Sequence, residues 1–504
     1  MTKLLKIFSI SLLLMFSYEK SSLAENSNNI TIDVHTHIFN GEDVPLDGFI
    51  EEIALHISSR NLLGQLLKPL IRPLTSTIQL WADGHEQENN QLDELLIKGG
   101  HQNADGHPAI PPLKITTQQL LKPGYQTSEA LKDKEQLEQL AGELNVGVSN
   151  LELENVLEEE CKSDFAFHLR SIQSWVRKFT APRHCNVKRL LKTYGDKGKI
   201  DFFVSATVDL DYWLKGRTKT QIEDQVIINS KLSVLSQGRI LPVVGFDPYR
   251  DVIEKGKAFQ IVQTAILDYG FVGIKLYPPM GFKPLGNKAE QYSKVKNKIW
   301  GKPHWGVPAL SDREFAIGIE QSLNRLYAWA EMHGVPIMAH ANKSNYSRKE
   351  FKNFAHPKNW EAVLKTYPEL KINLAHFGGM DSLTGQKKRW AQSIISLMNK
   401  YDNLYADTGN FKLRKRDGFF KYLEELKSYL NRPNSILGTR LMYGSDWFMH
   451  AARSYSEDYP NKLKKSLEKA KMPAQFITDF RGLNAVEFLG LREGEATRGR
   501  LDTF

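Results

Sequence analysis

The sequence predicts an α/β fold, a (β/α)8 barrel with a large helical insertion between its first and second strands. From residue 200 onward, short β-branched and apolar runs alternate with amphipathic stretches. Runs this short and this apolar are typical of parallel strands that are buried on both faces. One more such run, at residues 30–35, brings the predicted strands to eight, the number that closes a barrel of this kind.

Each predicted strand is a short run rich in Val, Ile, Leu, Phe or Tyr and bounded by polar or turn-forming residues. The eight runs are ITIDVH (30–35), DFFVSATVD (201–209), ILPVVGF (240–246), FVGIKLY (271–277), VPIMAH (335–340), KINLAHF (371–377), NLYADTG (403–409) and LMYGSDW (441–447). Helical patterns lie between them, as at 254–270 and 323–334. The second pattern ends in Gly334 before Val335 and Pro336, which is a typical helix stop.

The connection between the first two strands is much longer than a barrel needs. It contains apolar helical stretches at 49–57 and 62–74, and acidic and basic helical patterns near 151–160 and 168–179. The Gly-, Asn- and His-rich stretch near 83–111 is predicted to be a loop. The sequence therefore predicts a helical subdomain over the barrel mouth. The predicted divisions are 25–40 for the first strand, 41–196 for the insertion, 197–491 for the remaining barrel and 492–504 for a solvated tail.

Residues 1–24 have the pattern of a secretory signal peptide. Lys3 and Lys6 precede an apolar run from Ile7 to Phe16, and Ser22-Leu23-Ala24 forms a small-x-small end. The run is too short to cross a bilayer, which takes about 20 apolar residues. We expect cleavage after Ala24 and a periplasmic or secreted protein that has no stable membrane insertion afterwards.

Charge and cysteine content narrow the function classes. The net charge is +9, but the 67 basic residues are scattered and form no basic stripe interleaved with aromatic residues, which argues against nucleic-acid binding. Cys161 and Cys185 are the two cysteines. In an oxidising compartment they could form a disulfide, and two buried thiols are the alternative. Their spacing to each other does not indicate a metal site.

The stretch IDVHTHIFNG (32–41) points to a metal site. His35 and His37 lie two residues apart in a strand and therefore face the same side. They also lie at the carboxyl end of the strand, where barrels of this type form their active sites. The matching ends of other predicted strands carry Lys275, His340, His376 and Asp446. A lone strand-end histidine is more often structural, but imidazoles and a carboxylate gathered at one end suit a divalent metal with an open position for water.

In this order, the motifs resemble those of the amidohydrolase superfamily, in particular its branch related to aminocarboxymuconate-semialdehyde decarboxylase. The similar stretches are DVHTH, GIKLYPP, VPIMAH, NWEAVLKTYPELKINLAHFGG, YADTGN, LMYGSDW and NAVEFLGL. The resemblance covers the barrel, and nothing in the insertion matches. It implies His35, His37, His340 and Asp446 as metal ligands, and Asp446 and His376 as the catalytic residues. It favours one divalent ion over two, with zinc first and manganese, iron or nickel also compatible.

The role of Lys275 stays open between three interpretations. In binuclear relatives a lysine at this strand is carboxylated and bridges two metals, whereas in the decarboxylase-like branch that bridge is usually absent. Lys275 is then either a cationic substrate contact or a structural residue. Lys275, Tyr277, Asn40 and Trp447 are the predicted substrate-binding residues, because loops at this end of a barrel bind substrate. Lys275, Lys283 and Lys343 together favour an acidic substrate.

The sequence thus predicts an exported metal-dependent hydrolase that uses a metal-activated water on a C–N, C–O or similar bond of a small substrate. A metal-dependent non-oxidative decarboxylase on the same scaffold is the first alternative. A catalytically inert barrel that binds a ligand or a partner is the alternative from another class. The expected partner is a small-molecule substrate, and a homodimer is compatible with the sequence.

Overall fold

The computed structural model describes residues 30–54, 75, 78, 82, 84–99, 101, 177–293, 310–380, 383, 389–413, 416–449 and 455–503. Eight parallel strands pair in chain order, each with the next, which confirms the predicted (β/α)8 barrel. The strands are β1 (Ile32–Thr36), β2 (Phe202–Ala206), β3 (Ile240–Gly245), β4 (Gly273–Leu276), β5 (Ile337–His340), β6 (Ile372–Ala375), β7 (Leu404–Asp407) and β8 (Leu441–Met442).

Two backbone hydrogen bonds join the last strand to the first. Val34 N donates to Tyr443 O at 3.0 Å, and Asp446 N donates to His35 O at 2.6 Å. β8 itself spans two residues, because the backbone leaves the extended conformation before Asp446, whose φ is +58°. The barrel is therefore closed at the point where two of the predicted metal ligands lie.

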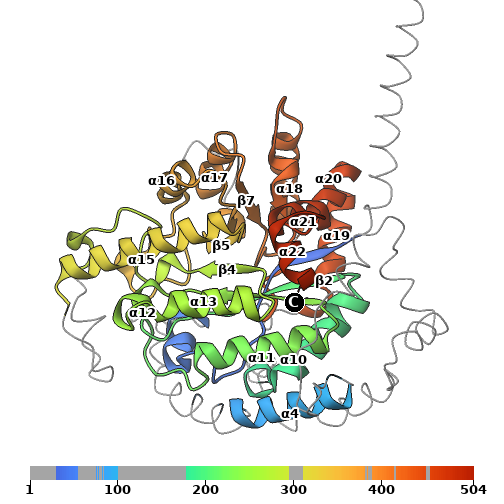
Figure 1. The fold of residues 1–504 in the computed structure, drawn as a ribbon. Helices are drawn as coiled ribbons and strands as arrows, with labels where there is room; N and C mark the ends of the chain where they lie inside the picture. Colours follow the sequence, from blue (N-terminus) through green and yellow to red (C-terminus); the bar gives the residue numbers. More distant parts are fainter. Residues whose placement is uncertain are drawn as a thin grey trace, which may run out of the picture.

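Helices surround the barrel (Figure 1). Between consecutive strands they are α11 (Ile222–Leu235), α12 (Pro248–Ile253), α13 (Lys257–Asp268), α15 (Asp312–Met332), α16 (Glu361–Thr366), α17 (Trp390–Met398) and α18 (Arg416–Leu430). Apolar side chains on the outer faces of the strands pack against them, such as Phe203, Ile274 and Leu374, all of which are buried. The helical patterns at 254–270 and 323–334 correspond to α13 and α15.

The interior of the barrel is a separate apolar cluster, which includes Val204, Val243 and Met338. After β8 come α19 (Tyr459–Lys469), α20 (Ala474–Thr478), η10 (Asp479–Leu483), α21 (Asn484–Leu489) and α22 (Ala496–Thr503). α21 and α22 close the end of the barrel opposite the mouth, where Leu501 is 1% exposed and joins the interior cluster. The prediction of a solvated tail at 492–504 is therefore wrong over α22, where Thr497, Arg498 and Leu501 are buried, while residues 492–494 are exposed.

A β-bulge in β1 turns the histidine pair inward. Asp33 pairs with Phe203, but Thr36 pairs with Ser205, so β1 holds one extra residue. Such an insertion reverses the alternation of side chains beyond it. As a result, His35 and His37 lie on the same face as the interior residue Val204, although Val34 also belongs to the interior cluster.

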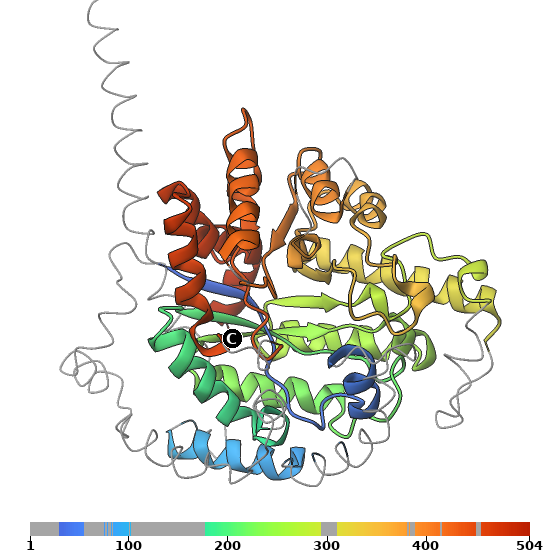
Figure 2. The same cartoon turned by 180° about the vertical axis from the view of Figure 1, so that it is seen from behind.

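The described part of the segment between β1 and β2 is mostly helical. It contains α2 (Leu46–Gly48), η1 (Phe49–Ala54), α4 (His85–Lys98), α10 (Arg183–Leu190) and η2 (Leu191–Asp196). α4 contacts α11 and lies on its outer side (Figures 1 and 2). The predicted loop near 83–111 is wrong over α4, where Leu92, Leu95 and Leu96 form a buried helical face. The predicted helices at 62–74 and 151–160, like residues 1–24, lie outside the described residues, and the boundaries of the insertion stay a prediction.

Cys185, in α10, is disulfide-bonded. The other cysteine of the sequence, Cys161, lies outside the described residues.

A buried ion network ties this segment to the loop after β1. The guanidinium of Arg183 donates through Nε to Asp43 Oδ2 at 2.8 Å and also bonds the carboxylate of Glu88, in α4. All three side chains are buried. Burial alone would raise the pKa of Glu88, but the charge of Arg183 holds that pKa below its usual value. The network holds α4, α10 and the loop that follows His37 in one arrangement.

Replacing Arg183 by Met should destabilise the protein strongly, because the carboxylates of Asp43 and Glu88 would stay buried without their counter-ion. Removal of one partner from such a network costs about 3–5 kcal/mol. The free energy of unfolding, measured by denaturant titration, checks this. The control Lys98→Ala removes only an exposed i,i+4 pair with Glu94 and should change that free energy by less than about 0.5 kcal/mol. Equal effects of the two variants would contradict the proposed role of the network.

Candidate metal centre

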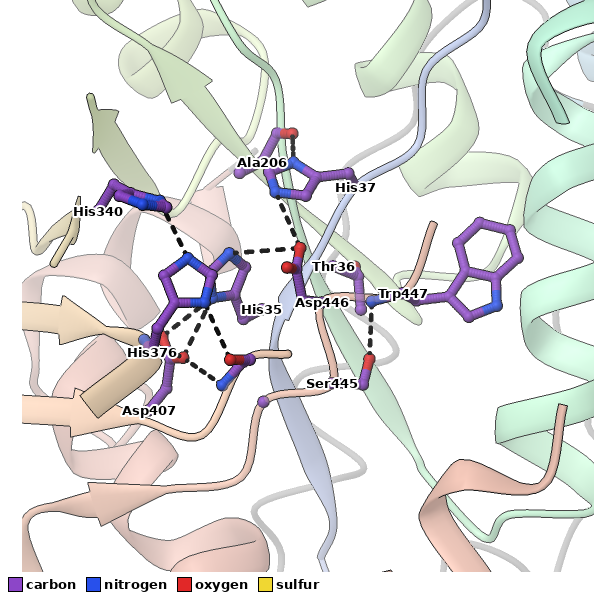
Figure 3. A network of polar contacts seen from close by, with 12 residues as sticks. His35, Thr36, His37, Ala206, His340, His376, Asp407, Ser445, Asp446 and Trp447 are labelled. Carbon is purple, nitrogen blue, oxygen red and sulfur yellow. Dashed lines mark hydrogen bonds and ion pairs between the residues drawn. The ribbon is translucent and has the colours of Figure 1, made fainter. Parts of the chain in front are cut away.

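The mouth of the barrel gathers the predicted site residues (Figure 3). His35 and His37 come from β1 and the residues just after it, Lys275 from β4 and His340 from the end of β5. His376 and Asp446 follow β6 and β8, and both have left-handed backbones, with φ of +69° and +58°. That conformation is unfavourable for residues other than glycine and is often found at functional sites, where the surroundings impose it.

His35, His37 and Asp446 form a cluster that fits a metal ion. One ligand atom from each lies within 4.8 Å of the others, and all three residues are buried. Asp446 Oδ1 lies 3.5 Å from His37 Nε2 and 3.9 Å from His35 Nε2. Nitrogen and carboxylate oxygen atoms in this number are a typical donor set for zinc and similar divalent ions.

The hydrogen bonds of the two rings place their lone pairs in this cluster. His37 Nδ1 lies 2.8 Å from Ala206 O, and His35 Nδ1 lies 3.1 Å from Asp407 Oδ1. Since both partners are acceptors, each Nδ1 carries the proton and each Nε2 carries a lone pair. Burial, and then the charge of Lys275, lower the pKa of His37 well below its usual value. Two lone pairs and a carboxylate therefore face one another, an arrangement that a cation stabilises.

Asp407, at the end of β7, orients His35. Its carboxylate accepts hydrogen bonds from His35 Nδ1, from Asn373 Nδ2 at 2.8 Å, and from the backbone N–H groups of His376 at 3.1 Å and Gly409 at 2.7 Å. Burial alone would raise the pKa of Asp407, but the neighbouring His35 holds it below its usual value. Asp407 is not among the residues that the sequence predicts for the site. Its position at a strand end in YADTG is the signal that could have found it.

Asp33 is a second site residue that the sequence does not predict. Its Oδ1 accepts hydrogen bonds from Ser445 N at 2.9 Å and from His35 N at 3.2 Å. It thereby links the backbone of one candidate ligand to the residue before Asp446. Burial raises the pKa of Asp33 to about 8.

His340 and His376 form a pair beside the cluster. His376 Nδ1 donates to Gly409 O at 2.9 Å, so its Nε2 accepts the hydrogen bond from His340 Nδ1 at 3.0 Å. The remaining nitrogen, His340 Nε2, then carries a lone pair and lies 3.3 Å from Ser344 Oγ. Burial, and then the charge of His35, lower the pKa of His376 to about 3, so this ring is neutral. The structure thus places the predicted ligand His340 against His376 rather than in the cluster of three.

Lys275 lies below the cluster and is fully buried. Its Nζ is 3.1 Å from His35 Nε2 and 3.1 Å from Met338 Sδ. Burial lowers the pKa of Lys275 to about 8. Lys275 therefore donates to the lone pair that a metal ion would use, and it does not line the pocket at the barrel mouth.

The other three predicted substrate contacts differ in position. Tyr277 lines the pocket, stacks on His340 at 5.5 Å between ring centroids, and places its hydroxyl 3.4 Å from His37 Nε2. Asn40 is instead a buried turn residue, whose side chain accepts a hydrogen bond from Glu42 N at 2.9 Å. The ring of Trp447 points away from the histidines (Figure 3), and Lys178 Nζ lies 3.7 Å from its centroid. Neither Asn40 nor Trp447 lines the pocket.

The pocket at the mouth has about 360 Å³ of empty space, including its opening. Its polar lining residues are His37, Tyr277, His340, Asn345, His376 and Asp446. Its apolar lining residues, called the apolar wall below, are Phe39, Phe49, Val208, Leu210 and Met449. Phe49 belongs to η1, so the segment between β1 and β2 contributes to the wall of the pocket. Two residues of the cluster, His37 and Asp446, thus line the pocket at the barrel mouth.

Comparisons with known proteins agree with this arrangement in part. Residues 257–491 match the family model described as amidohydrolase. No curated protein matches the chain significantly.

Three solved structures illustrate the structural similarity. An uncharacterised TIM-barrel protein from Bordetella bronchiseptica is 15% identical, with 64% of this chain and 89% of that chain covered and a TM-score of 0.38. An amidohydrolase from Burkholderia multivorans with bound zinc is 12% identical, with 60% and 87% covered and a TM-score of 0.36. The 4-oxalomesaconate hydratase from Rhodopseudomonas palustris is 16% identical, with 66% and 91% covered and a TM-score of 0.38.

The strand order of this chain shows the barrel fold. The family match over residues 257–491 spans β4 to β8 and includes Lys275, His340, His376 and Asp446. Over these residues the chain is therefore similar to the amidohydrolase family, and this match indicates an enzyme of the metal-dependent amidohydrolase type.

Proposed function

We propose that this protein is a hydrolase that binds one divalent metal ion, zinc first, through His35, His37 and Asp446. The observation that carries the proposal is the convergence of three buried ligand atoms within 4.8 Å, in a cluster from which His37 and Asp446 line the pocket. His340 is the further candidate ligand, because its Nε2 carries a lone pair and the residue lines the same pocket. Manganese, iron and nickel accept the same donor types.

A bound divalent ion would supply a Lewis acid and lower the pKa of a water molecule from 15.7 to about 7. The residues of the chain would do the rest. The carboxylate of Asp446 lines the pocket and is the nearest acceptor for the proton of an attacking water. The hydroxyl of Tyr277 lines it as well and is a hydrogen-bond donor for the oxygen of a substrate carbonyl.

The hydrogen bonds of His376 make it an acceptor in this arrangement. Its Nδ1 proton is engaged by Gly409 O, so its Nε2 has no proton to donate. His376 can therefore stabilise an oxyanion only after it takes up a proton. Acting as a proton acceptor or as a ligand for a second ion agrees better with its contacts than acting as a donor.

We also propose that the enzyme acts outside the cytoplasm, in the periplasm or after secretion, on a small-molecule substrate. The signal-like sequence at 1–24 supports this, as does the disulfide-bonded state of Cys185, because disulfides persist in oxidising compartments. Among the described helices, none combines the length and apolar character that crossing a membrane requires. Nucleic-acid binding is not part of the proposal, and a homodimer stays compatible with it.

Protein purified without added metal or chelator should contain about one divalent ion per chain. The variant His37→Ala should lose most of the ion, and hydrolysis of a small ester or amide should fall to background with it. Elemental analysis by mass spectrometry measures the ion. The control His85→Ala changes a partly exposed histidine in α4 and should keep both metal and activity.

Each other outcome of that experiment has a defined meaning. Absence of metal, even after incubation with zinc or manganese, would overturn the proposal. About two ions per chain would place His376 and a carboxylated Lys275 among the ligands. A metal-loaded protein that releases CO2 from aromatic acids but hydrolyses nothing would be a decarboxylase instead.

The variant Asp407→Asn should bind the metal about 10- to 100-fold more weakly, which is the usual effect of changing a group that orients a metal-binding histidine. Asparagine keeps an oxygen for the backbone N–H groups of His376 and Gly409 but loses the negative charge next to His35. Competition with a chromogenic chelator measures the affinity. The control Asp402→Asn, at an exposed position just before β7, should leave it unchanged. An unchanged affinity in Asp407→Asn would show that Asp407 has no influence on the ligand set.

A further inference from the structure

Five of the residues that line the pocket at the barrel mouth, the apolar wall, are apolar and have no role in the proposed chemistry. The wall consists of Phe39, Phe49, Val208, Leu210 and Met449. These residues come from the loop after β1, from η1, from the loop after β2 and from the loop after β8. Four of the five are buried, and Met449 is partly exposed at the rim. A wall built from four separate segments is a shaped surface for part of a substrate.

The loop after β2 is held in place from behind. Val208 and Leu210 face the pocket, while the alternate residues Asp209 and Asp211 face Arg250 in α12. Arg250 bonds Asp209 twice, through Nε at 2.6 Å and through a terminal nitrogen at 3.1 Å. All of these charged groups are buried. The two apolar side chains are therefore fixed toward the pocket by an ion network on the other side of their loop.

The aromatic part of the wall is fixed as well. The ring of Phe39 packs on Phe448 at 4.1 Å, on Phe49 at 5.7 Å and on Phe179 at 6.0 Å between centroids. On its other side it lies 6.0 Å from the ring of the candidate ligand His37. The apolar wall therefore begins next to the candidate metal cluster.

The charges near the pocket do not suit a substrate with several carboxylates. Among the described residues that line it, none is Lys or Arg, and one is the carboxylate of Asp446. Lys275 lies below the cluster, fully buried and in contact with His35. Lys283 and Lys343 do not line the pocket, and their Nζ atoms lie 5.7 Å from the rings of Phe354 and Trp390. A substrate carboxylate placed against the apolar wall would lose its hydration without gaining a partner.

From this geometry we infer that the substrate carries an uncharged hydrophobic group, aryl or alkyl, next to the bond that is cleaved, and that the apolar wall binds this group. The inference rests on the proposed function, because it places the reacting bond at the candidate metal cluster. It differs from the acidic substrate that the lysine residues of the sequence favoured.

Hydroxamic acids test the inference by binding alone, because the hydroxamate group chelates the ion and the attached group reaches the neighbouring wall. The probes are acetohydroxamate, benzohydroxamate and the monohydroxamate of succinic acid, titrated by calorimetry into the zinc-loaded full-length protein. Benzohydroxamate should bind at least about tenfold more tightly than acetohydroxamate, since burial of a phenyl group is strongly favourable. The succinic probe should bind no more tightly than acetohydroxamate.

Two variants and a control link the preference to the wall. Met449→Gln keeps the approximate size of the side chain and makes it polar, and Leu210→Asn does the same at a buried position. Each should reduce the preference for benzohydroxamate by about threefold or more. Met449 lies at the rim, so its variant remains informative if Leu210→Asn fails to fold. The control Leu267→Asn, at a half-exposed position in α13, should leave the preference unchanged.

The outcomes separate this inference from the proposed function. Binding of acetohydroxamate without any gain from the phenyl group would overturn the inference and leave the metal site intact. Tighter binding of the succinic probe would also overturn it, in favour of an acidic substrate. If none of the three probes binds the zinc-loaded protein, the proposed function fails, and the inference fails with it.

Discussion

One buried carboxylate holds three strand ends together at the mouth of the barrel. Asp407, from β7, accepts hydrogen bonds from a side chain of β1, a side chain of β6 and the backbone that follows β6 and β7. A buried charge is tolerated only where donors surround it, and here the donors are parts of the candidate site. Their arrangement fixes the tautomer of His35 and holds the backbone of His376 in its left-handed conformation. The geometry of the candidate cluster depends on this group, although Asp407 is not one of its three residues.

The segment between β1 and β2 takes part in the same construction from outside the barrel. The extra residue in β1 turns His35 and His37 inward. Arg183 fixes the loop after β1 through Asp43, and Phe49 in η1 completes the apolar wall of the pocket. The long connection is thus joined to the site by one ion network and one aromatic cluster.

The sequence predicted the eight strands, because parallel strands that are buried on both faces consist of continuous runs of apolar residues. It also located His35, His37, His376 and Asp446, since residues at the carboxyl ends of such strands meet at one mouth. The sequence did not predict the roles of Asp33 and Asp407. These roles depend on the N–H groups that donate to the two carboxylates, and most of those groups come from distant parts of the chain. Asn40 and Trp447 follow strand ends as well, yet their side chains turn into a loop and toward Lys178. The helices α4 and α22 are stabilised by contacts with residues far away in the sequence, in α11 and in the barrel interior. A local sequence pattern does not reveal such contacts.

The closure of the barrel has a consequence for the order of events during folding. Asp33 and Ser445 meet across 412 residues of sequence, and the backbone bond from Asp446 to His35 lies beside them. The three candidate ligands therefore come together only when the last strand docks on the first. Contacts between such distant residues form late in folding, because the entropy of the long loop must be lost before the contacts can offset it. A divalent ion would therefore bind an assembled cavity of fixed shape and not an incompletely folded chain.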